Sequence, residues 1–141
     1  MDIVQYGGLL NKAFCDLLIE KAKPKLSEAG VVGDNTDNRI AHHCWFDHDE
    51  FPELVQLKEW IAGTTELPIE NQENGTVVKY EIGGKYETHF DYFDGSVPLQ
   101  AEELKNGGNR VWSFLVYLNQ DFEGGQTYFP EYELSVEPEM G

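Results

Sequence analysis

Apolar residues recur at a helical interval near the start of the chain. They are spaced by four: Leu10, Phe14, Leu18, Ala22 and Leu26. This spacing places side chains on one face of a helix, so the pattern predicts an amphipathic helix over residues 9–29. Asn11 is a candidate N-cap, and Pro24 is expected to kink the helix or to end its regular part.

The next segments alternate between turn, strand and helix patterns. A run rich in Gly, Asp and Asn at 33–38 predicts a turn, and residues 40–46 predict a short strand. Pro52 opens a second helical segment, because the apolar residues after it fall on one side at helical spacing. Residues 64–75 are acidic and polar and predict a loop.

After Gly75 the pattern changes to the alternation of a strand. Residues 77–82 alternate in this way until Gly83-Gly84 breaks the pattern, and an extended piece over 86–93 follows. Residues 98–108 predict a loop. Residues 110–119 predict a strand that is central in a sheet, because it is apolar on both faces. Short strands are expected at 126–130 and 133–136.

Helices followed by short strands define the expected fold class. The order favours a mainly β, α+β chain: an antiparallel sandwich or jelly roll with N-terminal helices packed on one face. We expect one domain, since 141 residues bury one core but not two. Within it, residues 1–75 would supply the helices and first strand, and residues 76–141 the core of the sheet.

Composition and charge exclude several function classes. The formal net charge is −16, from 26 acidic and 10 basic residues, and this repels nucleic acid and anionic membrane surfaces. No apolar run is long enough to span a membrane and the N-terminus does not resemble a secretory signal, so a cytoplasmic location is expected. Cys15 and Cys44 are far apart in sequence and are expected to be buried, reduced thiols.

One pair of residues suggests metal chemistry. Residues i and i+2 of an extended backbone point to the same face, so His89 and Asp91 can converge on one ion. A histidine and a carboxylate make up two thirds of the two-His-one-carboxylate triad that holds non-haem Fe(II). By the same reasoning the neighbours His42 and His43 point to opposite faces, which makes a shared ion at that pair a weak hypothesis.

Several further elements occur in order around this pair. They are Val78-x-Tyr80-x-x-Gly83-x-x-Tyr86-x-x-His89-x-Asp91, then Arg110, then Tyr117-Leu118-Asn119, then Gly124-Gly125-Gln126-Thr127-x-Phe129-Pro130. Together they resemble the prolyl 4-hydroxylase family of Fe(II)- and 2-oxoglutarate-dependent dioxygenases, over nearly the whole chain. The resemblance implies a double-stranded β-helix, or jelly roll, with its last strands missing. It also implies hydroxylation of a proline-containing peptide or protein, with Fe(II), 2-oxoglutarate, O₂ and L-ascorbate taking part.

The resemblance also implies residue roles. His89 and Asp91 match the iron ligands, and the hydroxyls of Tyr80 and Thr127 match positions that hold 2-oxoglutarate. For Tyr117, a role facing the cosubstrate and a place in the core are both open. The substrate-gripping positions match Tyr86 and Arg110, although Arg110 can equally be a surface charge at the start of a strand. Gln126 stands where the family has Glu.

The third iron ligand has no match in this sequence. No histidine follows His89, and no late Lys or Arg is present to pair with the far carboxylate of 2-oxoglutarate. Three explanations are open: a fragment of a longer protein, a natural short form that is inactive or is completed by another chain, or replacement of the ligand by His42, His43 or His48. A non-catalytic interaction or structural domain is therefore the alternative to an enzyme. The oligomeric state is not predicted.

Overall fold

The computed structural model describes residues 3–28 and 39–141, which form two compact units. One unit contains the chain up to Pro24 together with residues 115–141, and the other contains residues 25–114. The turn-rich run predicted at 33–38 lies outside the described residues. The predicted division at residue 75 stays a prediction.

The first unit is built on α1, Lys12–Ala22. Asn11 caps it as predicted, because its side-chain Oδ1 accepts a hydrogen bond from the Phe14 backbone N–H at 2.9 Å. The buried face carries Cys15, Leu18 and Ala22. The predicted extension to residue 29 is wrong: Pro24 lies in a 3₁₀ turn, η1 (Lys23–Lys25), because proline cannot donate the next helical hydrogen bond.

Two short strands at the end of the chain complete this unit. Strand β6 (Thr127–Phe129) pairs antiparallel with β7 (Leu134–Val136) across the 3₁₀ turn η4 (Pro130–Tyr132), which confirms both predicted strands. Backbone hydrogen bonds at Gly141 tie the ends together, since its carbonyl accepts from Leu10 N–H at 2.9 Å and its N–H donates to the Tyr117 carbonyl at 3.0 Å.

The second unit contains two small antiparallel sheets. In one, β3 (His42–Phe46) lies between β1 (Ser27–Glu28) and β4 (Gly75–Lys79). In the other, β2 (Arg39–Ile40) pairs with β5 (Lys85–Tyr86), and Arg39 is directly opposite Tyr86. The single strand predicted over 40–46 is therefore divided between two sheets, and the strand predicted over 77–82 lies at 75–79.

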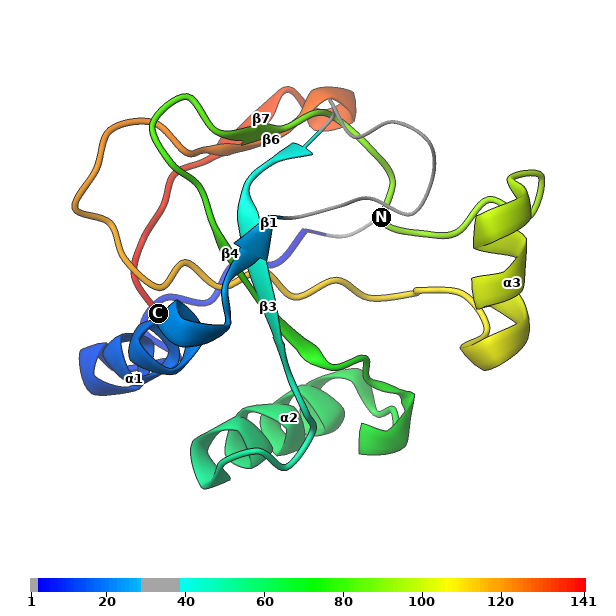
Figure 1. Ribbon diagram of the computed structural model, residues 1–141, viewed down its shortest axis with the longest axis horizontal. Helices are drawn as coiled ribbons and strands as arrows, with labels where there is room; N and C mark the ends of the chain where they lie inside the picture. The colour runs from blue at the N-terminus through cyan, green and yellow to red at the C-terminus, as the bar shows by residue number, and fades with distance from the viewer. Residues whose placement is uncertain (1–2, 29–38) are drawn as a thin grey trace. The chain divides into compact units, whose positions relative to one another are not determined.

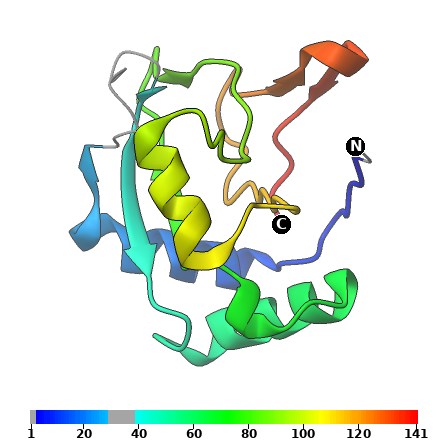
Figure 2. The same cartoon turned by 90° about the vertical axis from the view of Figure 1, so that its right-hand side faces the viewer.

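The core of the second unit lies between β3 and the helix that follows it. Helix α2 (Pro52–Thr65) begins at the predicted proline and lies at the end of the sheet where β3 finishes and β4 begins (Figures 1 and 2). The ring of Phe46, which is 1% exposed, packs edge-on against Phe51 with centroids 5.3 Å apart. Leu54 and Cys44 are also buried there. A 3₁₀ turn, η3 (Ile69–Asn71), leads from α2 towards β4.

Three predictions for residues 86–119 are wrong. Residues 98–107 form α3 (Pro98–Gly107) and not a loop, because proline at N1 precedes a run of strong helix formers. Residues 110–119 carry no strand: no strand in the described part of the chain pairs with them, and Val111 is 75% exposed. The extended piece 86–93 is irregular beyond β5.

The described residues thus combine helices with small antiparallel sheets, and a jelly roll stays a prediction. Cys15 and Cys44 are buried free thiols, as expected. In the described ranges no helix has the length and apolar character needed to cross a membrane.

Candidate metal and substrate site

His89 and Asp91 lie on the irregular segment between β5 and α3, and their side chains converge. His89 Nε2 is 3.2 Å from Asp91 Oδ1. Two atoms that each ligate one metal ion at about 2.1 Å, at right angles to each other, are about 3.0 Å apart. The pair therefore has the spacing of two ligands of one ion.

The contact of His89 Nδ1 with Glu87 indicates which ring nitrogen carries the proton in the neutral imidazole. Nδ1 lies 2.7 Å from the backbone carbonyl oxygen of Glu87, which can only accept a hydrogen bond. In the neutral imidazole the proton is therefore on Nδ1, and Nε2 presents a lone pair to the carboxylate. Two acceptors at this distance repel each other unless a proton or a cation lies between them, so the same geometry serves an ion pair with a protonated His89 and the binding of one metal ion.

Asp91 is held by two residues from the segment after α3. The Ser113 hydroxyl donates a hydrogen bond to Asp91 Oδ2, and Arg110 Nη1 donates to the Asp91 backbone carbonyl at 3.2 Å. One carboxylate oxygen of Asp91 thus has a fixed donor, while Oδ1 faces His89. Such partners orient a ligand before metal arrives.

Tyr86 connects His89 to Arg39. Its ring is stacked on the His89 imidazole, with centroids 3.7 Å apart and planes inclined by 20°. The Arg39 guanidinium carbon lies 4.8 Å from the centroid of the same ring, a cation–π distance. The pairing of β2 with β5 produces this arrangement, because it puts Arg39 opposite Tyr86.

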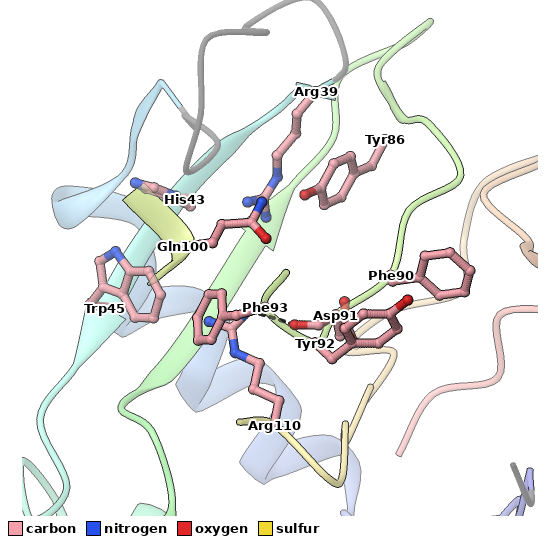
Figure 3. A pocket seen from close by; sticks show the side chains of 10 residues that line it. All are labelled: Arg39, His43, Trp45, Tyr86, Phe90, Asp91, Tyr92, Phe93, Gln100 and Arg110. Atoms are coloured by element: carbon pink, nitrogen blue, oxygen red, sulfur yellow. Dashed lines mark hydrogen bonds between the residues drawn. The ribbon is translucent and has the colours of Figure 1, made fainter. Parts of the chain in front are cut away.

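These residues border a pocket of about 170 Å³ (Figure 3). Half of the residues that line it are Trp, Tyr or Phe, and the others are polar or charged: Arg39, His43, Trp45, Tyr86, Phe90, Asp91, Tyr92, Phe93, Gln100 and Arg110. Arg110 lies over the Phe93 ring, 4.4 Å from its centroid. Each arginine of the pocket thus lies against an aromatic ring, which restricts its orientation.

Unsatisfied nitrogen atoms mark one side of the pocket. Arg39 Nε and His43 Nδ1 are buried and have no hydrogen-bond partner. Burial lowers the pKa of His43, and the charge of Arg39 lowers it further, so the neutral imidazole is favoured.

The residues predicted to hold 2-oxoglutarate fall in both units: Tyr80 is in the second unit, and Tyr117 and Thr127 are in the first. Tyr80 follows β4 in the second unit, where burial raises the pKa of its phenol and the nearby Arg39 partly offsets that rise. In the first unit the Tyr117 hydroxyl lies 2.6 Å from Thr127 Oγ1 and donates to the Val136 carbonyl at 3.3 Å. Tyr117 and Thr127 therefore form one hydrogen-bonded group.

The structure does not bring a third ligand to His89 and Asp91. Across residues 3–28 and 39–141 no three His, Cys, Asp or Glu side chains gather as a metal site. His43 lines the pocket through β3, and His48 is exposed in the loop after β3.

Several residues that shape the site were not identified from the sequence. Arg39, Trp45 and Gln100 line the pocket, and Glu73 pairs with Arg110 through both carboxylate oxygens. These residues contact the site from strands and loops distant in sequence, so no local spacing marks them. Lys58, which donates a hydrogen bond to the Glu73 backbone carbonyl, is the exception. It falls on the apolar face of α2, one turn after Leu54, and a charged residue on an apolar helix face can be recognised from the sequence.

Comparison with known proteins relates the residues around this site to a protein family. Residues 75–141 match the model of the 2OG-Fe(II) oxygenase superfamily, and they include the converging pair His89 and Asp91. This part of the chain is therefore similar to the 2OG-Fe(II) oxygenase superfamily. The family takes Fe(II), 2-oxoglutarate and O₂, which agrees with the predicted chemistry.

Similarity to individual known proteins extends beyond the matched residues. The chain is 36% identical over 135 residues to prolyl 4-hydroxylase 5 of Arabidopsis thaliana, an alignment that covers 90% of this chain and 44% of that protein. It is 35% identical to probable prolyl 4-hydroxylase 10 of the same plant, over 89% of the chain and 44% of that protein. It is also 31% identical to prolyl 4-hydroxylase subunit alpha-1 of Rattus norvegicus, over 99% of the chain and 27% of that protein. The chain thus spans less than half the length of these relatives.

Proposed function

We propose that the chain supplies part of the active site of an Fe(II)- and 2-oxoglutarate-dependent dioxygenase. The substrate would be prolyl residues of a peptide or protein, and succinate and CO₂ would be co-products. The match of residues 75–141 to the 2OG-Fe(II) oxygenase superfamily supports the chemistry. The substrate class is suggested by the names of the similar prolyl 4-hydroxylases. A jelly roll that holds the metal at its mouth would be the corresponding fold.

The observation that carries this proposal is the approach of His89 Nε2 to Asp91 Oδ1, to 3.2 Å. The Glu87 carbonyl orients the imidazole, and Ser113 and Arg110 hold Asp91 in place. Both side chains would therefore be arranged before an ion arrives, which lowers the cost of ordering them on binding.

The resemblance to the prolyl 4-hydroxylase family supports the remaining roles. Bound Fe(II) would couple O₂ reduction to decarboxylation of 2-oxoglutarate and to substrate hydroxylation, and ascorbate would keep the iron reduced. Tyr80 would donate a hydrogen bond to a 2-oxoglutarate carboxylate oxygen. Thr127 would do so after a rotation of the Tyr117 hydroxyl, because Tyr117 donates to the Val136 carbonyl in the structure and takes up the one hydrogen of Thr127. Because Tyr117 is hydrogen-bonded to Thr127, we assign it the orientation of that hydroxyl.

The pocket beside Asp91 suits an extended proline-containing peptide. Aromatic walls are the surfaces that recognise polyproline II segments, whose rings pack on them while their carbonyl oxygens accept hydrogen bonds. Tyr86 lines this pocket, and the guanidinium groups of Arg39 and Arg110 provide donors in it. Both guanidiniums are already oriented by ring contacts, so little side-chain entropy would be lost on binding.

Succinate release tests the proposal. In the full reading frame that encodes this chain, we expect Fe(II)-dependent release of succinate, and we expect His89→Ala and Asp91→Ala each to abolish it. His48→Ala and Asp49→Ala are matched controls, because they remove the same side-chain types from an exposed loop and should leave turnover unchanged. Full turnover in both site variants would refute the assignment.

A non-catalytic interaction or structural domain is the second candidate function. The observation that favours it is the lack of a third ligand around His89 and Asp91 in the described residues. For the 141-residue chain by itself, we expect weak Mn(II) binding and no turnover. Tight Mn(II) binding by calorimetry would contradict that expectation, and a histidine followed by Lys or Arg further along the reading frame would remove most support for this candidate.

A further inference from the structure

Lys58 is the one charged side chain that is buried in the described part of the chain, with 4% of it exposed. It lies on α2, and its Nζ donates to the backbone carbonyl of Glu73 at 2.7 Å. Burial lowers the pKa of Lys58, which records the cost of removing the ammonium from water. Lysine is rarely buried this completely unless a specific contact requires it.

A second hydrogen bond connects the same two segments in the opposite direction. Gln72 Nε2 donates to the backbone carbonyl of Lys58 at 2.8 Å. Residue 58 therefore donates to residue 73 through its side chain and accepts from residue 72 through its backbone. Together these bonds fix the backbone that carries the Glu73 side chain against one turn of α2.

The Glu73 side chain contacts Arg110, which lines the pocket. Its carboxylate accepts from Arg110 Nε and, at 2.7 Å, from Arg110 Nη2. Arg110 then donates through Nη1 to the backbone carbonyl of Asp91 at 3.2 Å (Figure 3). A bidentate pair of this kind requires the carboxylate to hold one position and one orientation.

We propose that Lys58 is a positioning residue that holds Glu73 so that its carboxylate keeps Arg110 beside Asp91 at the pocket. A role in stability alone does not explain a buried ammonium, because an apolar side chain of similar length would fill the space without the desolvation cost. The contacts run in one sequence from Lys58 through Glu73 and Arg110 to Asp91. The consequence for peptide binding rests on the proposed function, whereas the positioning itself does not.

The Arg110 side chain reports this positioning directly. The sequence contains two arginines, Arg39 and Arg110, so the ¹⁵N-labelled 141-residue chain gives two Nε–H signals, and Arg39→Lys assigns them. Glu73→Gln, which removes the bidentate carboxylate, gives the reference for a released Arg110. We expect Lys58→Met to move the Arg110 signal towards that reference and to speed its exchange with water. Gln56→Met, on an exposed position of the same helix, should leave the signal unchanged.

The positioning role is refuted if the Arg110 signal in Lys58→Met matches that of the unchanged chain while Glu73→Gln moves it. Thermal unfolding of each variant shows whether it is folded. Should Lys58→Met not fold, Gln72→Leu removes the second bond and leaves the lysine in place. We expect the same shift there, and an unmoved Arg110 signal in that variant would overturn the proposal.

Peptide binding separates this inference from the proposed function. With a fluorescein-labelled deca-L-proline peptide, we expect Lys58→Met to weaken binding by about three- to tenfold, as loss of one oriented donor would. If the unchanged chain does not bind the peptide but Lys58→Met moves the Arg110 signal, the proposed substrate is wrong and the positioning role stands. If Arg110→Gln weakens binding and Lys58→Met changes neither binding nor the signal, the positioning role is wrong.

Discussion

The ring of Tyr86 is stacked on the imidazole of His89, with centroids 3.7 Å apart. This contact and the bond from Nδ1 to the Glu87 carbonyl fix both the plane and the tilt of the His89 ring. The tyrosine predicted to grip substrate therefore also contacts the residue predicted to bind metal. Its position comes from strand pairing, because β5 sets Tyr86 opposite Arg39 on β2.

Removing the stacked ring should weaken metal binding. We expect Tyr86→Leu to reduce Mn(II) affinity by about three- to tenfold, because an aromatic pair contributes about 0.5–1.5 kcal/mol beyond its buried area. Tyr86→Phe keeps the stacked ring and should retain the affinity. Electron paramagnetic resonance of free Mn(II) measures both. Equal losses in the two variants would show that the phenol hydroxyl matters and not the stacking.

The aromatic core of the second unit should dominate its stability. Phe46 is 1% exposed and packs edge-on against Phe51, so Phe46→Ala should lower the free energy of unfolding by about 3–5 kcal/mol. Phe90→Ala is the control, because Phe90 is 67% exposed and its truncation should cost less than about 0.5 kcal/mol. Urea unfolding followed by circular dichroism measures both. Similar losses at the two positions would contradict the placement of the core.

The cap of α1 gives a smaller, local effect. Asn11→Ala removes the acceptor for the Phe14 N–H and should cost about 1 kcal/mol of unfolding free energy. Asn11→Asp keeps a side-chain oxygen at the same place and should retain the stability. The comparison uses thermal unfolding of the two variants. An alanine variant as stable as the aspartate variant would show that the cap contributes nothing.

Acid should destabilise the second unit through His43. Burial, and then the charge of Arg39, lowers the folded-state pKa of His43, so the unfolded chain takes up its proton first as the pH falls below about 6.5. Between the unfolded and folded pKa values the unfolded state binds more protons, and stability decreases with falling pH. His43→Phe should remove this part of the pH dependence.

The measurement for His43 is urea unfolding over a series of pH values from neutral into mild acid. His48→Phe is the matched control, because His48 is exposed and should keep the pH dependence of the unchanged chain. Parallel curves for His43→Phe and the unchanged chain would show that His43 is not the titrating group.

Local patterns were sufficient for the elements whose ends are set by single residues. The start of α1 at Asn11 and of α2 at Pro52 follow from the capping oxygen and from a ring that fits the first helical turn. The hairpin of β6 and β7 follows from alternation and a short connection. Residues 110–119 show where local patterns fail to predict a strand, because an apolar run becomes a strand only where another strand accepts its hydrogen bonds.

For the site, the sequence by itself determined the pair. The i, i+2 spacing of His89 and Asp91, and the family resemblance of the ordered elements around them, predict an iron- and 2-oxoglutarate-dependent chemistry. Only the tertiary structure decided what holds that pair. Ser113 and Arg110 reach Asp91 from another segment, and Glu73 meets Arg110 across 37 positions of sequence. Spacing describes neighbours along one strand or helix, whereas these contacts depend on how separate segments pack, and packing is a property of the folded chain.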